Sequence, residues 1–196
     1  MSRTLLAAFM ACGLSLHAHA GDGESTVPPD SADFQKAWEA YGAPEPAHEE
    51  MTKRVGDWAV EASSWVSGND EPVVSAATAE IEMILGGRFL QQKYIGSFDG
   101  TPYAGEGTLA YDNKLKVYKG TWIDTVSTGI MLTEGTYDAE SKTLTETGKS
   151  IGPFPGANTK FITHYISDDH FVMTVYCDET GQMRKSMQLI YTRVTE

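Results

Sequence analysis

The chain has 196 residues and carries 27 acidic against 15 basic residues, which gives a formal net charge of −12 at pH 7. A chain this acidic is repelled by phosphate backbones and anionic lipids, so we expect neither nucleic acid nor an anionic membrane surface as a partner. The acidic residues are scattered along the sequence, which is typical of a solvated surface.

The N-terminal segment has the pattern of an export signal. A basic residue stands near its start, residues 5–16 are apolar, and Ala18-His19-Ala20 matches a cleavage site of the Ala-x-Ala type. The apolar run is shorter than the roughly 20 residues that a membrane-spanning helix needs. We therefore predict a signal peptide over residues 1–20, cleaved after Ala20. The mature protein is then periplasmic or secreted and is not inserted in the membrane.

Cysteine content limits how the mature chain is stabilised. Cys12 would anchor the chain if the segment were a lipoprotein signal, and a buried N-terminal helix is the other alternative to cleavage. Cleavage removes Cys12 and leaves Cys177 as the one cysteine, so no internal disulfide can form. Stability must then come from the core, which a domain of about 150 residues can supply by burying roughly 70% of its unfolded surface. Because Cys177 alternates with apolar residues on one strand face, we expect a buried, inert thiol.

Residues 21–45 are predicted to form a linker followed by a short helix. The first ten of these residues are rich in glycine, serine, threonine and proline, a composition typical of a flexible connection. Ser31 is well placed to cap a helix that ends at Trp38 or Ala40. The prolines and glycine that follow end it.

The rest of the chain, residues 46–196, is predicted to form one all-β domain. It begins with a second helix over residues 47–54, for which Pro46 is a suitable first residue. After this helix the side chains alternate in ten short segments that are separated by turn residues. Regular strands at this spacing, with no helices between them, are typical of an antiparallel barrel or sandwich. The predicted strands are residues 57–66, 75–84, 87–96, 103–111, 115–123, 128–137, 143–150, 159–166, 170–177 and 184–194.

We predict that this sheet closes into a barrel of about ten antiparallel strands. Closure removes the open strand edges that would otherwise pair with other chains. A barrel of eight to ten strands either fills its interior with side chains or holds one small ligand there. The function of such a protein therefore depends on what its interior holds.

The sequence Gly56-Asp57-Trp58 lies where the second helix meets the first strand. It resembles the Gly-x-Trp signature of lipocalins and related barrels. The resemblance implies that Trp58 lies across one end of the barrel, covered by a basic side chain from a late strand. Arg193 is the candidate, and an arginine over an indole contributes roughly 0.5–2 kcal/mol. Trp58 and Arg193 are therefore predicted to close the barrel.

A wider resemblance covers the chain from about Pro46 to Arg193. Its segments are His48, Val55-Gly56-Asp57-Trp58, residues 84–90, Gly105-Glu106-Gly107, Tyr111-Asp112, residues 120–124, Ser127-Thr128 and Asp168-Asp169-His170. In these segments the chain is similar to the bacterial family DUF1579, a domain of unknown function with a lipocalin-like barrel. The resemblance implies the fold and provides no catalytic residues.

The barrel interior is the predicted ligand site. Trp122 and Asp124 share one face of a strand, so an inward-facing Trp122 turns Asp124 inward as well. A buried carboxylate needs partners, and Arg88 is one candidate. The alternative is that Trp122 belongs to a solid core and Asp124 is a turn residue at the strand end. The predicted ligand-binding residues are Arg88, Tyr94, Tyr103, Trp122, Asp124, Tyr176 and Met187.

No motif predicts catalysis, and we predict no catalytic residue and no metal site. The sequence contains neither a Gly-x-Ser-x-Gly elbow nor a Gly-x-x-x-x-Gly-Lys phosphate loop. Barrels similar to nitrobindin hold haem through one histidine, and His164 and His170 lie on neighbouring predicted strands. We interpret both as solvated or hydrogen-bonded residues and predict no cofactor.

The leading hypothesis is an exported barrel that binds a small, largely apolar ligand. One alternative is an enzyme with a polar site around Asp124, Arg88 and His170, which requires those side chains to converge in a cleft. The other alternative is a structural protein whose barrel is filled.

Overall fold

The computed structural model describes residues 31–65, 71–98, 100–151, 157–178 and 181–195. The predicted signal peptide, its cleavage site and the first part of the predicted linker lie outside the described residues. The chain divides into two compact units, residues 1–37 and residues 38–196. The described part of the first unit is the start of helix α2 (Ser31–Gly42).

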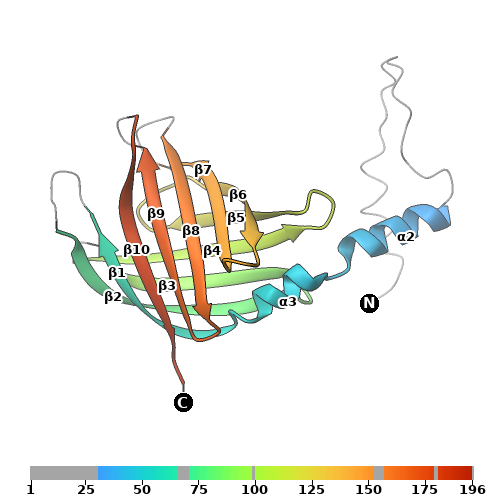
Figure 1. Ribbon diagram of the computed structural model, residues 1–196, viewed down its shortest axis with the longest axis horizontal. Coiled ribbons are helices and arrows are strands. Elements are labelled where there is room, and N and C mark those ends of the chain that lie inside the picture. The colour runs from blue at the N-terminus through green and yellow to red at the C-terminus, as the bar shows by residue number, and fades with distance from the viewer. Residues whose placement is uncertain (1–30, 66–70, 99, 152–156, 179–180, 196) are drawn as a thin grey trace. The chain divides into compact units, whose positions relative to one another are not determined.

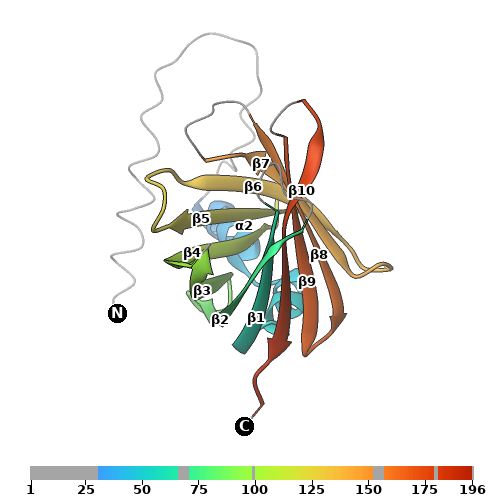
Figure 2. The same cartoon turned by 90° about the vertical axis from the view of Figure 1, so that its left-hand side faces the viewer.

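The second unit contains a closed barrel, in which ten strands are described (Figures 1 and 2). Each strand pairs with the next one along the chain in antiparallel fashion, and the last strand pairs with the first. The prediction of a ten-stranded antiparallel barrel is therefore confirmed. The strands are β1 (Gly56–Ser64), β2 (Val73–Ile84), β3 (Phe89–Phe98), β4 (Thr101–Asp112), β5 (Val117–Asp124), β6 (Met131–Asp138), β7 (Thr143–Lys149), β8 (Asn158–Ser167), β9 (His170–Asp178) and β10 (Met183–Arg193).

The first and last strands, β1 and β10, pair and close the barrel. They are the two strands furthest apart in the sequence, so their pairing is the hardest to predict from it. Strand β1 pairs with β10 over seven residues, in a register that places Trp58 opposite Arg193. This pairing satisfies the backbone groups that an open sheet would leave exposed on both edges. It also brings the two residues that were predicted to close the barrel onto adjacent strands.

The two N-terminal helices differ little from their predicted bounds. Helix α2 runs two residues further than the longer predicted end, to Gly42. Helix α3 (Pro46–Thr52) begins at the predicted proline. Its start is stabilised by a reciprocal cap, in which the Glu45 backbone N–H donates to His48 Nδ1 over 2.9 Å. No helix in the described part of the chain is long and apolar enough to cross a membrane.

Tight turns connect the strands. In the turn between β2 and β3, Gly86 and Gly87 adopt φ values of 71° and 79°, a left-handed conformation that glycine accommodates without a steric penalty. In the turn between β4 and β5, the Asp112 carboxylate accepts hydrogen bonds from two following backbone N–H groups. Short connections of this kind keep neighbouring strands in register, so that alternate side chains all face one interior.

Strand β1 shows how alternation builds that interior. Trp58, Val60 and Ala62 are buried, whereas Asp57 and Ala59, on the other face of the strand, are exposed. Helix α3 contacts β2 and β3 and buries Met51. Helix α3 therefore adds Met51 to the buried core of the barrel.

Candidate ligand-binding site

The barrel encloses a cavity of about 440 Å³. All ten strands contribute to its wall, and more than half of the lining residues are apolar. Polar side chains also line it, among them Gln92, Asp124, Thr133, Glu146 and Thr163. Cavities of a few hundred cubic ångströms, apolar with a few convergent polar groups, are typical sites for small ligands.

Trp58 is buried at one end of the barrel. Its side chain is 1% exposed, and its indole Nε1 donates to the backbone carbonyl of Arg54 over 3.0 Å. The Arg193 guanidinium lies 4.3 Å from the centre of the indole ring. Phe171 packs against the same indole, with ring centres 4.8 Å apart, and stacks on Tyr191 at 4.2 Å. Large rings therefore fill this end.

The guanidinium of Arg193 is held by several acceptors. Its Nη2 donates to the carbonyls of Lys53 and Asp168 over 2.7 and 2.6 Å, and its Nη1 donates to the carbonyl of Val55. Its Nε donates to the Asp169 carboxylate over 2.7 Å. These bonds tie the residues after α3 to the turn between β8 and β9. Arg193 therefore covers Trp58 as a cation and links these two segments through hydrogen bonds.

A second polar cluster lies toward the opposite end of the strands. Trp122 Nε1 donates to the Tyr103 hydroxyl over 3.0 Å, and that hydroxyl donates to Asp124 Oδ2 over 3.2 Å. The Val126 backbone N–H donates to Asp124 Oδ1 over 3.0 Å. Tyr94 contacts the Tyr103 and Trp122 rings edge-on. Burial raises the pKa of the Tyr103 hydroxyl, which keeps it neutral and able to donate.

Two glycines on β4 make room for the Trp122 indole. Gly107 is its register partner on β4, and a Cβ added there would come within 2.8 Å of the ring. A Cβ added at Gly105 would clash with the same ring. The absence of side chains at both positions lets the indole lie flat against the strand. This gives a physical reason for glycine at both positions of Gly105-Glu106-Gly107.

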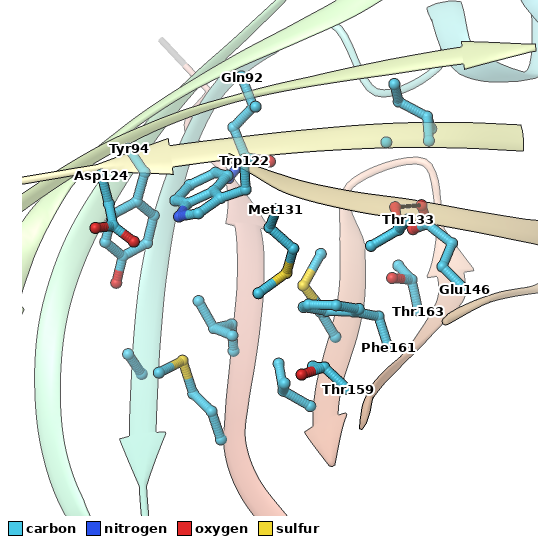
Figure 3. A pocket seen from close by; sticks show the side chains of 18 of the residues that line it. Gln92, Tyr94, Trp122, Asp124, Met131, Thr133, Glu146, Thr159, Phe161 and Thr163 are labelled. Atoms are coloured by element: carbon cyan, nitrogen blue, oxygen red, sulfur yellow. Dashed lines mark hydrogen bonds between the residues drawn. The ribbon is translucent and has the colours of Figure 1, made fainter. Parts of the chain in front are cut away.

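Glu146 on β7 is a buried carboxyl in the cavity wall that was not predicted. Its side chain is 8% exposed, and Oε1 accepts a hydrogen bond from Thr133 Oγ1 over 2.7 Å (Figure 3). Burial raises the pKa of this carboxyl, and the Thr133 hydrogen bond opposes the shift only in part. Gly120 and Gly135 leave the space that the side chain occupies, because a Cβ at either position would meet it.

A family model described as "Protein of unknown function (DUF1579)" matches residues 43–193. The chain belongs to the DUF1579 family. The match covers helix α3 and all ten strands, and so the whole cavity wall lies within it.

Solved structures show the same fold in other proteins. The crystal structure of Rv2717c from M. tuberculosis superposes with a TM-score of 0.58 at 14% identity, covering 78% of this DUF1579 chain and 100% of that chain. The S-type phycobiliprotein lyase CPES from Guillardia theta gives a TM-score of 0.53 at 14% identity, covering 81% and 97%. No curated protein matches the chain. At this identity the likeness shows the fold alone.

Five of the seven predicted ligand-binding residues line the cavity of the DUF1579 barrel. Tyr94, Tyr103, Trp122 and Asp124 form the cluster described above. Met187 lines the cavity from β10. The pairing register of β10 with β9 shifts between Lys185 and Met187. This irregularity lets two consecutive residues, Ser186 and Met187, both line the cavity.

Arg88 lies outside the cavity. It is exposed in the turn between β2 and β3, where its Nε donates to the carbonyl of Gly42 over 2.7 Å. Asp124 on β5 pairs with Gly105 on β4, and Gly105 pairs with Tyr94 on β3. Arg88 precedes Tyr94 by six residues and lies just before β3 begins. Six residues of strand span about 20 Å. Arg88 therefore does not reach Asp124, whose partners are Tyr103 and a backbone N–H instead.

Tyr176 also lies outside the cavity. Its neighbours Val175 and Cys177 both line the wall, so alternation turns Tyr176 to the outer face of β9. The Cys177 thiol is half-buried rather than fully buried, and it accepts a hydrogen bond from Ser186 Oγ over 3.3 Å. The inward face of this strand thus includes the cysteine and excludes the tyrosine.

The histidines do not enter the described wall of the cavity. His164 is exposed beside Thr143, and His170 contacts Thr192 at the end of the barrel where Trp58 lies. Asp124 lies at the other end of its strand, so Asp124, Arg88 and His170 do not form a common site. Within the described residues, no group of three or more His, Cys, Asp or Glu side chains is placed to hold a metal ion.

Proposed function

We propose that this DUF1579 protein binds one small, largely apolar ligand in its barrel. The observation that carries the proposal is the cavity of about 440 Å³, walled mainly by apolar and aromatic side chains. A void of this size leaves many wall atoms without packing partners, which a ligand would supply. It also argues against the alternative of a filled, purely structural barrel. The likeness in fold to a phycobiliprotein lyase supports the proposal by analogy alone.

Apolar burial provides part of the affinity. Burying ten methylene groups contributes about 8 kcal/mol, whereas immobilising a ligand costs on the order of 4–15 kcal/mol. Apolar contact alone therefore gives weak binding in a site of this size. The polar groups in the wall must orient the ligand and decide its identity.

The first test asks whether the purified protein contains a ligand. The protein would be isolated without denaturation, extracted with organic solvent and analysed by mass spectrometry. In parallel, the uncharged fluorescent probe N-phenyl-1-naphthylamine would be titrated into the extracted protein. We expect either a co-purified molecule or saturable probe binding at one site per chain. Failure of both would refute the proposal.

A pair of variants locates the binding site. Ala62→Phe places a ring in the cavity from β1, and we expect probe affinity to fall by about tenfold or more. Ala59→Phe makes the same change on the exposed face of the same strand and should leave probe affinity unchanged. Equal affinities in the two variants would show that the probe binds elsewhere.

We also propose that the protein is exported. The support is the signal-like pattern of residues 1–20, which ends at Ala18-His19-Ala20. Expression of the full chain in a bacterial host, followed by N-terminal sequencing of the exported fraction, tests it. A mature chain that begins at Gly21 is the expected result, and an uncleaved chain in the cytoplasm would contradict it.

A further inference from the structure

Glu146 is an acid without a counter-charge inside an apolar cavity. Thr133 Oγ1 occupies one carboxyl oxygen, at 2.7 Å from Oε1. Among the described residues, Oε2 has no hydrogen-bond partner and no lysine or arginine forms an ion pair with Glu146. Glu146 is 8% exposed as a whole, yet Oε2 is not among the fully buried, unpaired side-chain atoms of the described residues, so this oxygen retains accessible surface. Because Glu146 lines the cavity, Oε2 is an acceptor that a ligand in the cavity can reach.

The other charged groups in the cavity wall already have partners. Arg54 contacts Ser167 O at 3.1 Å and Glu50 at 3.3 Å, and its guanidinium lies over the Tyr165 ring. Both carboxylate oxygens of Asp124 accept hydrogen bonds, as described above. Glu146 is thus the charged group in the described wall that a ligand can still neutralise.

The surroundings of Glu146 suit a cation. Phe161 is its register partner on β8 and lines the cavity (Figure 3). Aromatic faces attract a cation, and a carboxylate binds an ammonium group through a charge-assisted hydrogen bond. The net charge of −12 favours the approach of a positive ligand and disfavours a negative one.

We propose that the cavity is selective for amphiphilic amines, whose ammonium group pairs with Glu146 while the apolar body fills the barrel. This inference rests on the ligand-binding function proposed above and names its ligand class. Thr133 holds the carboxyl, and the aromatic wall contacts the rest of the ligand.

A matched series of ligands tests the selectivity. Decylamine, decanol and decanoate share one apolar chain and differ in the charge of the head group. Each would compete with N-phenyl-1-naphthylamine for the extracted wild-type protein, below its critical micelle concentration. We expect decylamine to displace the probe at a concentration about tenfold lower than decanol, with decanoate weakest. Decanol binding as well as the amine, or decanoate binding best, would overturn the proposal.

Two variants assign the effect to Glu146. Glu146→Gln keeps the shape and an acceptor for Thr133, and should lower decylamine affinity by about tenfold while leaving decanol binding unchanged. Glu134→Gln removes the same charge from the exposed face of β6 and should preserve the preference. An unchanged amine preference in folded Glu146→Gln would contradict the assignment. If this variant does not fold, the wild-type series still decides.

The outcomes separate the two proposals. If decanol binds and the amine has no advantage, the ligand-binding function stands and the amine selectivity is wrong. If the probe and all three ligands fail to bind, the ligand-binding function itself is wrong.

Discussion

The two ends of the barrel are built from the same strands but are filled differently. At the end near α3, the large rings of Trp58, Phe171 and Tyr191 contact one another and are almost fully buried. Toward the other end of β1, the inward positions hold small side chains, Ala62 and Ser64, and both line the cavity. Alternation sets which residues face inward, and the size of those residues sets whether the interior is packed or hollow.

Charged side chains of the barrel also differ in how completely the protein satisfies them. Arg193 and Arg54, near α3, each make several hydrogen bonds to protein acceptors. Glu146, in the cavity wall, makes one, to Thr133. A charge that the protein satisfies completely stabilises the fold, whereas a charge that it satisfies in part is available to a ligand.

The largest expected difference concerns the two tryptophans. Trp58→Ala removes a fully buried ring from the packed end and should lower the free energy of unfolding by about 3–5 kcal/mol. Trp122→Ala enlarges a cavity that already exists, so its cost should be smaller. Urea denaturation of both variants measures the difference. Equal losses, or a midpoint for Trp58→Ala that barely moves, would show that the end near α3 is not the better packed one.

A smaller difference is expected between two arginines. Arg193→Gln removes a guanidinium that covers Trp58 and bonds several carbonyls, and should cost about 1.5–3 kcal/mol. Arg88→Gln removes a guanidinium that also bonds carbonyls but is exposed in a turn, and should cost less than about 1 kcal/mol. Thermal unfolding of the two variants compares them. A larger loss of stability from Arg88→Gln would show that the contacts of Arg193 contribute less to stability than those of Arg88.

The smallest effect concerns the pH dependence of stability. Burial raises the pKa of Glu146 above its ordinary value of 4.5, so the folded protein holds this proton more tightly than the unfolded chain. The resulting stabilisation is complete below pH 4.5 and is lost as the pH rises through the folded pKa. Glu146→Gln should therefore gain stability relative to wild type as the pH rises through this range.

Urea midpoints at a series of pH values measure that change, with Glu134→Gln as the exposed control. A difference between Glu146→Gln and wild type that is constant with pH would mean that the carboxyl is not desolvated in the folded protein.

Alternation along single strands predicts much of the fold and part of the site. It places Trp122 and Asp124 on one face, and both line the cavity. Applied to β7, the same rule could have identified Glu146, which shares its face with the buried Leu144. Applied to β9, it excludes Tyr176, because Val175 and Cys177 occupy the inward positions.

The wrong prediction for Arg88 shows that alternation along a single strand cannot predict which residues of different strands meet. The distance of Arg88 from Asp124 depends on how far each strand is displaced along its neighbours around the barrel. That displacement is set by strand pairing and turn geometry, which no one segment contains.

The amino-acid sequence by itself determined the ten strands, the antiparallel barrel and the position of Trp58 at one end of it. These features depend on local alternation, on turn residues and on the short signature Gly56-Asp57-Trp58. Only the tertiary structure decided that the interior is hollow, that Asp124 pairs with Tyr103, and that Glu146 finds no counter-charge among the described residues. The physical reason is that cavities and charge pairing arise from side chains on different strands, whose relative heights are set when the sheet closes.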